Sequence, residues 1–381
     1  MANIPKVILL VETSREYGRA LLRGIARYSR LHGPWAFYRE TGGLEQAIPR
    51  LKDWGANGVI TRDSRRIHEL AILGVPTIVA VHFKRRLDIT SIDTNGAKIG
   101  EMAAEHLLNR GFQHFGYCGF DDMQWSETRR KSFKERISEN GFETYVYKQP
   151  KSIRKRQWQQ EQRIMADWLK SLPKPIGLMA CNDDRGQHVA EACKIAQLKV
   201  PDDVAIVGVD NDELVCDLAD PPLSSIALNV EKGGYQAAEL LDKLMKGEKV
   251  ESSSITVEPT HVVVRQSTDI LAIEDPAVSK AVRFIRENSG KPIQVSEVVL
   301  YVAVSRRCLE QRFKIILGRS INKEIKRVRT ERISRMLVET DENIGHIALD
   351  LGFPGIDHIS RYFRAEKGIS PQKFRLSFRS K

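Results

Sequence analysis

The sequence predicts a two-lobed α/β body followed by an all-helical module that contains two helix-turn-helix units. Three observations support this prediction. Short apolar runs alternate with longer amphipathic segments from residue 6 to about 266, the alternation stops after Arg265, and the last quarter of the chain is basic and helical in pattern. We expect parallel sheets covered by helices in the body. Two lobes are expected because 381 residues and this many strands exceed one compact sheet.

Strands are expected where short runs are rich in β-branched and other apolar residues. The expected strands are 7–11, 35–38, 58–60, 77–81, 114–118, 144–147, 177–180, 204–209 and 256–264. Helices are expected where apolar residues recur every three or four positions. The expected helices are 15–31, 44–54, 64–73, 96–109, 127–140, 157–172, 185–196 and 232–246.

Polar residues follow most of these strands at their carboxyl ends. They are Glu12, Asp63, His82, the pair Asn182 and Asp183, and the pair Asp210 and Asn211. Open parallel sheets bind ligands at that edge, and carboxylates there accept hydroxyl hydrogen bonds from a neutral polyhydroxy ligand. Arg129 and Asn229 are the expected donors, and Tyr17 or Trp125 can stack on the apolar face of a sugar.

Simpler explanations exist for each of these residues taken singly. Asp63, Asp183 and Asp184 suit helix N-caps, and Asp93 suits a turn. Tyr17 and Trp125 suit packing between elements. Only the convergence of the whole set favours a ligand cleft.

The C-terminal module is expected to begin after a linker, with 1–268 as the sensing and dimerisation domain, 269–276 as the linker and 277–381 as the DNA-binding domain. Asp275 and Pro276 predict a helix start, and the helix runs through residue 287. Ser296 and Ser305 are expected to cap the two helices of the first helix-turn-helix. A long helix, 321–338, leads to the second one, in which Gly352 separates helices 344–351 and 356–366.

The net charge of +11 lies entirely in this module. Residues 280–381 hold 22 Lys and Arg against 11 Asp and Glu, so the remainder of the chain is neutral. A basic module on a neutral body is typical of proteins that contact phosphates, although a solvated basic surface has the same composition. The outward residues of the second helices are the expected DNA contacts: Ser305, Arg306, Arg307, Gln311, Asp357, His358, Arg361 and Arg364.

The body resembles the effector-binding core of the LacI–GalR repressors, which is similar to periplasmic sugar-binding proteins. The stretches that carry the resemblance are SIDTNGAKIGEMAAEHLLNRGFQHFGYCG at 91–119, ACNDDRG at 180–186, VPDDVAIVGVDNDE at 200–213 and PPLSSIALNVEKGGYQAAELL at 221–241. The resemblance implies that Asp93, Arg129, Asn182, Asp183, Asp210 and Asn229 line an interlobe cleft. Those repressors begin with a DNA-binding headpiece, whereas this chain opens on the first strand. The full set of expected ligand residues is Glu12, Tyr17, Asp63, Asp93, Trp125, Arg129, Asn182, Asp183, Asp210, Asn211 and Asn229.

The C-terminal module resembles the AraC-family DNA-binding domain from Asp275 onward. The signature is VSRRCLEQRFK at 304–314 with IALDLGF at 347–353 and ISRYFRAEKGISPQKFR at 359–375. Gly355 stands where that family more often has a capping Ser or Asp, and Ile359 where it commonly has Phe. A LacI-like core without a headpiece, joined to an AraC-type module, resembles the xylose operon regulators.

The combined resemblance implies a transcription factor, an activator, that senses D-xylose or another pentose and binds double-stranded promoter DNA as a homodimer. RNA polymerase would then be a further partner. The sequence leaves open which pentose is bound, whether regulation is positive or negative, and the operator. Two other functions are compatible with the pattern of polar residues: a sugar-processing enzyme using paired carboxylates such as Glu12 and Asp210, and a solute-binding protein for transport.

Several observations count against those two alternatives. The five cysteines form no C-x-x-C pair, and no nucleophile elbow, metal-ligand spacing or phosphate-binding loop is found, so neither a metal nor a cofactor nor catalysis is expected. The apolar run after Met1 is too short for a signal peptide core or a membrane span. We therefore expect a cytoplasmic protein without membrane contact.

Overall fold

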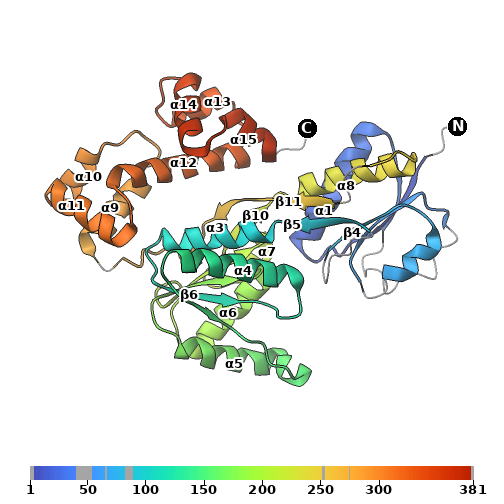
Figure 1. Cartoon of the computed structure of the whole chain (residues 1–381), viewed down its shortest axis with the longest axis horizontal. Helices are drawn as coiled ribbons and strands as arrows, with labels where there is room; N and C mark the ends of the chain where they lie inside the picture. Colours follow the sequence, from blue (N-terminus) through green and yellow to red (C-terminus); the bar gives the residue numbers. More distant parts are fainter. Residues whose placement is uncertain are drawn as a thin grey trace. The chain divides into compact units, whose positions relative to one another are not determined.

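The computed structural model describes residues 4–39, 54–64, 67–81, 89–250, 254–273 and 275–378. The chain folds into two compact units. The α/β unit comprises Met1–Glu105 and His114–Asp269, and the helical unit comprises His106–Gln113 and Ile270–Lys381. Figure 1 shows the elements of each unit, coloured along the sequence.

The first lobe of the α/β unit is built on a parallel sheet of order β11-β5-β4-β3-β1-β2. Apolar strand residues such as Val7 and Ile60 pack against residues of the covering helices in one hydrophobic core. Near-continuous apolar strands are expected for a sheet that is covered on both faces. The strands are β1 (Lys6–Leu10), β2 (Ala36–Arg39), β3 (Gly58–Arg62), β4 (Thr77–Ala80), β5 (Thr90–Thr94) and β11 (Ser254–Val257).

The second lobe has a sheet of order β12-β10-β9-β8-β6-β7, parallel except for the β10–β12 pair at its edge. Strands β8 and β9 are buried along their whole length. The strands are β6 (His114–Cys118), β7 (Thr144–Val146), β8 (Ile176–Ala180), β9 (Val204–Val209), β10 (Ser224–Leu228) and β12 (Pro259–Val263).

Helices α1 (Glu16–His32) and α8 (Val230–Met245) lie side by side on the first sheet (Figure 1). They approach closely because Gly24 faces α8: a Cβ there would lie 1.9 Å from the backbone oxygen of Glu231. The other helices of this unit are α3 (Gly96–Leu108), α4 (Gln124–Glu139), α5 (Trp158–Ser171), α6 (Asp183–Ala196) and α7 (Glu213–Leu218), with 3-10 turns η2 (Ile67–Leu73), η3 (Ile153–Arg156) and η4 (Gln266–Thr268).

The chain passes between the two lobes three times. Strands β1 to β5 build the first sheet and β6 to β10 the second, after which β11 returns to the first sheet and β12 to the second. The carboxyl ends of the parallel strands of both lobes therefore border one interlobe space. This is the edge at which the sequence predicted a ligand.

The expected strands at 114–118 and 204–209 are confirmed to the residue, and most others to within two residues. The single strand expected at 256–264 was wrong, because Glu258 separates β11 and β12, which pair in different sheets. Strands β5 and β10 were not expected. Their sequences, TSIDT and SSIAL, are too polar to stand out as apolar runs.

Among the expected helices of the α/β unit, most are confirmed within a few residues. The segment expected as helix 64–73 is the 3-10 helix η2 over Ile67–Leu73, and α7 was not expected because it has only six residues. The expected helix 44–54 lies outside the described residues except for Trp54, and so does His82.

The helical unit contains α9 (Pro276–Glu287), α10 (Val295–Val302), α11 (Arg306–Leu317), α12 (Ile321–Glu339), α13 (Ile344–Asp350), α14 (Ile356–Lys367) and α15 (Pro371–Phe378). The long α12 connects two helix groups, each with its own apolar core (Figure 1). Phe313 is fully buried in the first core and Phe363 in the second.

The capping residues explain where these helices begin. Asp275 accepts hydrogen bonds from the backbone of Ala277 and Val278, and Ser305 accepts one from Cys308, as the sequence predicted. The expected cap at Ser296 was wrong: Gln294 caps α10 in a capping box with Glu297, so Ser296 lies inside the helix.

The short segment His106–Gln113 is embedded in the helical unit. The Nη1 of Arg319 donates to the side-chain oxygen of Asn109 at 2.9 Å, and the backbone of Ala272 donates to the carbonyl of Arg110 at 2.8 Å. Burial and the nearby guanidinium groups, that of Arg110 foremost, hold the pKa of His106 well below its usual value. This imidazole is therefore neutral at physiological pH.

Candidate ligand cleft and nucleic-acid interface

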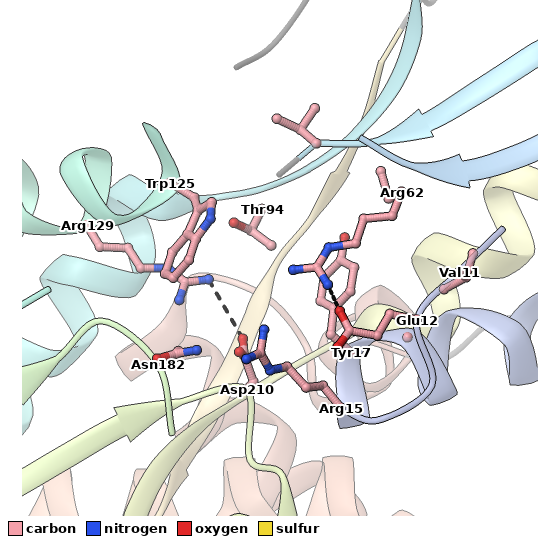
Figure 2. A pocket seen from close by; sticks show the side chains of 13 residues that line it. Val11, Glu12, Arg15, Tyr17, Arg62, Thr94, Trp125, Arg129, Asn182 and Asp210 are labelled. Carbon is pink, nitrogen blue, oxygen red and sulfur yellow. Dashed lines mark ion pairs between the residues drawn. The ribbon is translucent and has the colours of Figure 1, made fainter. Parts of the chain in front are cut away.

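A pocket lies between the two lobes of the α/β unit, at the carboxyl ends of the strands (Figure 2). It holds about 700 Å³ of empty space, and that space includes open solvent. Its lining mixes carboxylates, guanidinium groups, an amide and two aromatic rings. The lining residues are Val11, Glu12, Arg15, Tyr17, Gly18, Arg62, Ala80, Val81, Thr94, Trp125, Arg129, Asn182 and Asp210.

Arg129 of α4 is the most buried charged residue of the pocket, at 3% exposure. Its guanidinium donates to the carbonyl of Cys181 and lies over the Trp125 ring, 4.9 Å from the centroid. Its Nη2 lies 3.8 Å from an oxygen of Asp210, and its Nε has no hydrogen-bond partner in the described part of the chain. A guanidinium whose Nη2 lies beside a pocket carboxylate is suited to donate to a ligand oxygen.

Asp210 follows β9 and has a backbone φ of +102°, in the region that favours glycine. Burial raises the pKa of its carboxyl to about 6, Arg129 opposes the rise and Asp184 adds to it. The group is therefore only partly protonated near neutral pH. When it is ionised, the Asp210 carboxylate is a hydrogen-bond acceptor that lies 3.8 Å from the donor Nη2 of Arg129. The pocket therefore has an acceptor and a donor side by side.

The opposite wall comes from the first lobe. Glu12, two residues after the end of β1, forms an ion pair with Arg62 at the end of β3 (Figure 2). Burial, then Asp210 and Asp93, raise the pKa of Tyr17, which keeps this hydroxyl protonated. Gly18 of α1 permits this helix to approach the chain at Glu12 closely, because a Cβ would lie 1.8 Å from the carbonyl oxygen of Glu12.

The pocket chemistry suits a compact ligand with several hydroxyl groups. Each carboxylate accepts two or more hydrogen bonds, the guanidinium groups and the Asn182 amide donate, and Trp125 offers an aromatic face. The three arginines and two carboxylates of the lining nearly balance in charge. This balance favours a neutral ligand over a strongly charged one.

Six of the expected ligand residues line the pocket: Glu12, Tyr17, Trp125, Arg129, Asn182 and Asp210. Asn182 also caps α6, because its side chain accepts a hydrogen bond from the backbone of Arg185. The N-cap role suggested by the sequence for Asp183 and Asp184 is therefore taken by Asn182. The other expected residues are not among the lining: Asp63, Asp93, Asp183, Asn211 and Asn229.

Asp183 and Asn211 form hydrogen bonds within the second lobe and do not line the pocket. Asp183 is 2% exposed, accepts from the Ser225 hydroxyl and the backbone of Asp212, and has a pKa raised well above its usual value by burial and Asp210. Asn211 donates its backbone N–H to Ser225. Asp93 accepts a hydrogen bond from the backbone of Thr94.

Sequence reasoning missed Arg15, Arg62 and Thr94. Arg62 is the last residue of β3, and its position at the end of a strand could have indicated a pocket residue. The strand-end pattern of the sequence instead predicted the next residue, Asp63, as the ligand contact. Arg15 precedes α1 and pairs with Asp184 of the other lobe at 2.8 Å. No local pattern reveals that second contact, because the partners are far apart in the sequence.

The helical unit presents two second helices of helix-turn-helix units, α11 and α14. Each begins after a short turn containing a residue with positive φ, Ala303 (+62°) in the first and Gly352 (+68°) in the second. Gly355 caps α14 without a side-chain hydrogen bond. The predicted DNA contacts are all exposed: Ser305, Arg306, Arg307 and Gln311 in the first unit, and Asp357, His358, Arg361 and Arg364 in the second.

The apolar sides of these helices hold them in place. Leu309 and Phe313 of α11 are fully buried, as are Ile359 and Phe363 of α14. Arg329 of α12 donates to the carbonyl of Leu351, in the turn of the second unit. Both helices therefore expose one polar, largely basic face, which is the geometry for reading a major groove.

Among the described residues, no group of three or more His, Cys, Asp or Glu is placed to hold a metal ion. Within the same residues, no helix combines the length and apolar character needed to cross a membrane.

Two family models match the chain, a periplasmic binding protein-like domain over residues 104–268 and a helix-turn-helix domain over residues 299–377. The xylose operon regulatory protein of Haemophilus influenzae is 31% identical over 98% of both chains. The protein of the same name from Escherichia coli K12 is 31% identical, covering 97% of this chain and 96% of that one.

A solved structure described as the xylose-binding transcription activator XylR aligns over 98% of both chains, with a TM-score of 0.62 and 28% identity. A LacI-type regulator from Alkaliphilus metalliredigens, with a TM-score of 0.57 and 21% identity, shares the fold of the α/β unit and covers 70% of this chain. The chain combines a pocket between two lobes with two helix-turn-helix units, and its 31% identity to these relatives extends over nearly its whole length. It therefore belongs to the family of xylose operon regulatory proteins, which are transcriptional regulators rather than enzymes.

Proposed function

We propose that the protein is a pentose-responsive transcriptional activator, with D-xylose as its effector. The observation that carries the proposal is the joining of a polyhydroxy-type pocket and a double helix-turn-helix in one chain. Support for the ligand comes from the aligned structure of a xylose-binding activator, and from relatives named for the xylose operon.

In this proposal the sugar binds between the lobes and stabilises their closed arrangement. A ligand shifts such an equilibrium only by its differential affinity for the two states, about 1.4 kcal/mol for each factor of ten. Arg129 and Asp210 contact hydroxyl groups and Trp125 packs against the ring. Closure then changes how a homodimer presents its helix-turn-helix units to promoter DNA in the cytoplasm, with RNA polymerase as the final partner.

Calorimetry of the full-length protein against D-xylose, L-arabinose, D-ribose and D-glucose tests the ligand. We expect one site per chain and the tightest binding for D-xylose. Arg129→Ala should reduce affinity by a factor of ten or more, because a buried charged donor is lost. Arg130→Ala is the matched control, since the neighbouring Arg130 is paired with Glu127 at the surface. Absence of binding to every sugar would refute the sugar assignment.

Binding to upstream operon DNA at several salt concentrations tests the other end of the chain. The logarithm of affinity should fall linearly with the logarithm of salt, and D-xylose should change the affinity. Arg361→Ala should weaken binding to the operator, while Arg283→Ala, exposed on α9, should change it little. An affinity that is independent of both salt and sugar would contradict the proposed mechanism.

A further inference from the structure

The loop between β9 and α7, residues 210–212, is held rigidly by the second lobe. Its three successive backbone N–H groups donate to the carbonyl of Ile226 at 2.9 Å, to the hydroxyl of Ser225 at 3.0 Å and to the carboxylate of Asp183 at 2.8 Å. Asp210 and Asn211 both have positive φ, at +102° and +50°. Such a backbone persists only where its surroundings fix it, so the positions of the loop side chains are fixed as well.

Asp212 stands at the N-cap position of α7 but makes no side-chain capping bond to that helix. Its carboxylate instead extends to the first lobe. One oxygen accepts from the backbone N–H of Glu16 at 2.7 Å, and the other accepts from Nη2 of Arg19 at 2.9 Å. The residue is 4% exposed, so these contacts are shielded from solvent.

Helix α1 needs this carboxylate from the other lobe. Its own N-cap residue, Arg15, makes no side-chain capping bond, and the backbone N–H of Glu16 in the first turn donates to Asp212 instead. A negative charge at a helix N-terminus is also favoured by the helix dipole. The second lobe therefore caps a helix of the first lobe, and separation of the lobes would break both contacts.

The same loop carries a pocket residue and the interlobe cap. Asp210 lines the pocket, and Asp212 lies two residues later on a backbone with fixed geometry. A ligand that holds Asp210 in place thus also holds Asp212 against α1. Conversely, the cap favours the closed lobes and so presents a complete pocket to the ligand.

We propose that Asp212 is a positioning residue for effector binding: its carboxylate caps α1 across the cleft and binds Arg19, and these contacts hold the lobes in the ligand-binding arrangement. This inference rests on the proposed sugar-binding function for its affinity readout. Its geometric core, the cap between lobes, is independent of which ligand the pocket takes.

The test uses the full-length protein with Asp212→Asn and Arg19→Gln, which alter the two sides of the same contact. Asp202→Asn, an exposed aspartate before β9, is the matched control. D-xylose affinity is measured by calorimetry, and hydrogen exchange of residues 15–20 is measured without sugar. Asp212→Asn should weaken D-xylose binding by about tenfold or more with unchanged stoichiometry, as expected for a shielded charged hydrogen bond.

Asp212→Asn should also speed hydrogen exchange in the first turn of α1, and Arg19→Gln should act in the same direction, while Asp202→Asn leaves both readouts at the wild-type level. A merely structural role would instead lower thermal stability and leave the D-xylose affinity of the folded protein unchanged. Affinity within twofold of wild type in folded Asp212→Asn, or unchanged protection of α1 in both variants, would overturn the inference. If the wild-type protein binds no sugar, the proposed function fails, and hydrogen exchange alone still decides the role of Asp212.

Discussion

Sugar affinity should depend on pH through Asp210. Burial raises the pKa of this carboxyl to about 6, from an ordinary value near 3.8, in the protein without ligand. The charged groups that act on it are Arg129 and Arg15, which favour its ionised form, and Asp184 and Asp212, which disfavour it. A sugar hydroxyl donates best to the ionised form, so the proton and the sugar compete for this carboxylate.

The magnitude and the sign follow from this pKa. About nine-tenths of the Asp210 carboxyl is ionised at pH 7, and about one-tenth at pH 5. If the sugar binds only the ionised form, its affinity is near its maximum above pH 7 and falls about tenfold by pH 5. Because the folded pKa is raised, the affinity is lost as pH falls through about 6, well above the ordinary range of an aspartate.

The assay is calorimetry with D-xylose at half-unit steps from pH 5 to pH 7.5, at constant ionic strength. Asp210→Asn provides the comparison, because an amide of similar size does not titrate. The variant should bind more weakly at pH 7, with an affinity that is nearly independent of pH. A flat profile for the wild type, or the same slope in the variant, would show that Asp210 does not control the competition.

Three further predictions concern stability and the pocket wall. Glu324→Gln should lower the free energy of unfolding of the helical unit by about 3 kcal/mol, because it removes a fully buried carboxylate that binds Arg319 and Arg327. Urea titration, together with hydrogen exchange of α12, measures this loss. Phe363→Ala should cost about 3–5 kcal/mol and abolish DNA binding while calorimetry still detects the wild-type sugar affinity. Gly18→Ala should weaken sugar binding in the same calorimetric assay, because its Cβ would lie 1.8 Å from a backbone oxygen of the pocket wall.

The fold was largely predictable because most strands and helices have strong local patterns. Strands such as Val204–Val209 are uniformly apolar, and α11 and α14 show clear helical spacing with recognisable starts. The failures occurred where the local pattern is weak. The strand Ser224–Leu228 begins with two serines, whose buried hydroxyl groups donate to the carbonyl of Arg265 and to the carboxylate of Asp183.

The pocket was predictable in part for a similar reason. The position of Asp210 after a buried strand is a local signal, whereas the pairing of Arg62 with Glu12 depends on β3 lying beside β1. Asp183 illustrates the opposite limit. Its residue type and strand-end position suit a ligand contact, yet in the structure its carboxylate holds the loop of Asp212. Sequence alone does not distinguish a residue that faces a pocket from one that supports its wall.

The embedding of His106–Gln113 in the helical unit affects how such regulators can be dissected or recombined. Arg319 binds Asn109, a residue 210 positions earlier, and Gly111 leaves room for Ile273: a Cβ there would lie 2.6 Å from its side chain. A fragment that begins at the linker would lose these contacts. Gene fusions that exchange DNA-binding modules at that linker would therefore join surfaces that had not evolved together. The helical module and residues His106–Gln113 before β6 should therefore be exchanged together, as one structural unit.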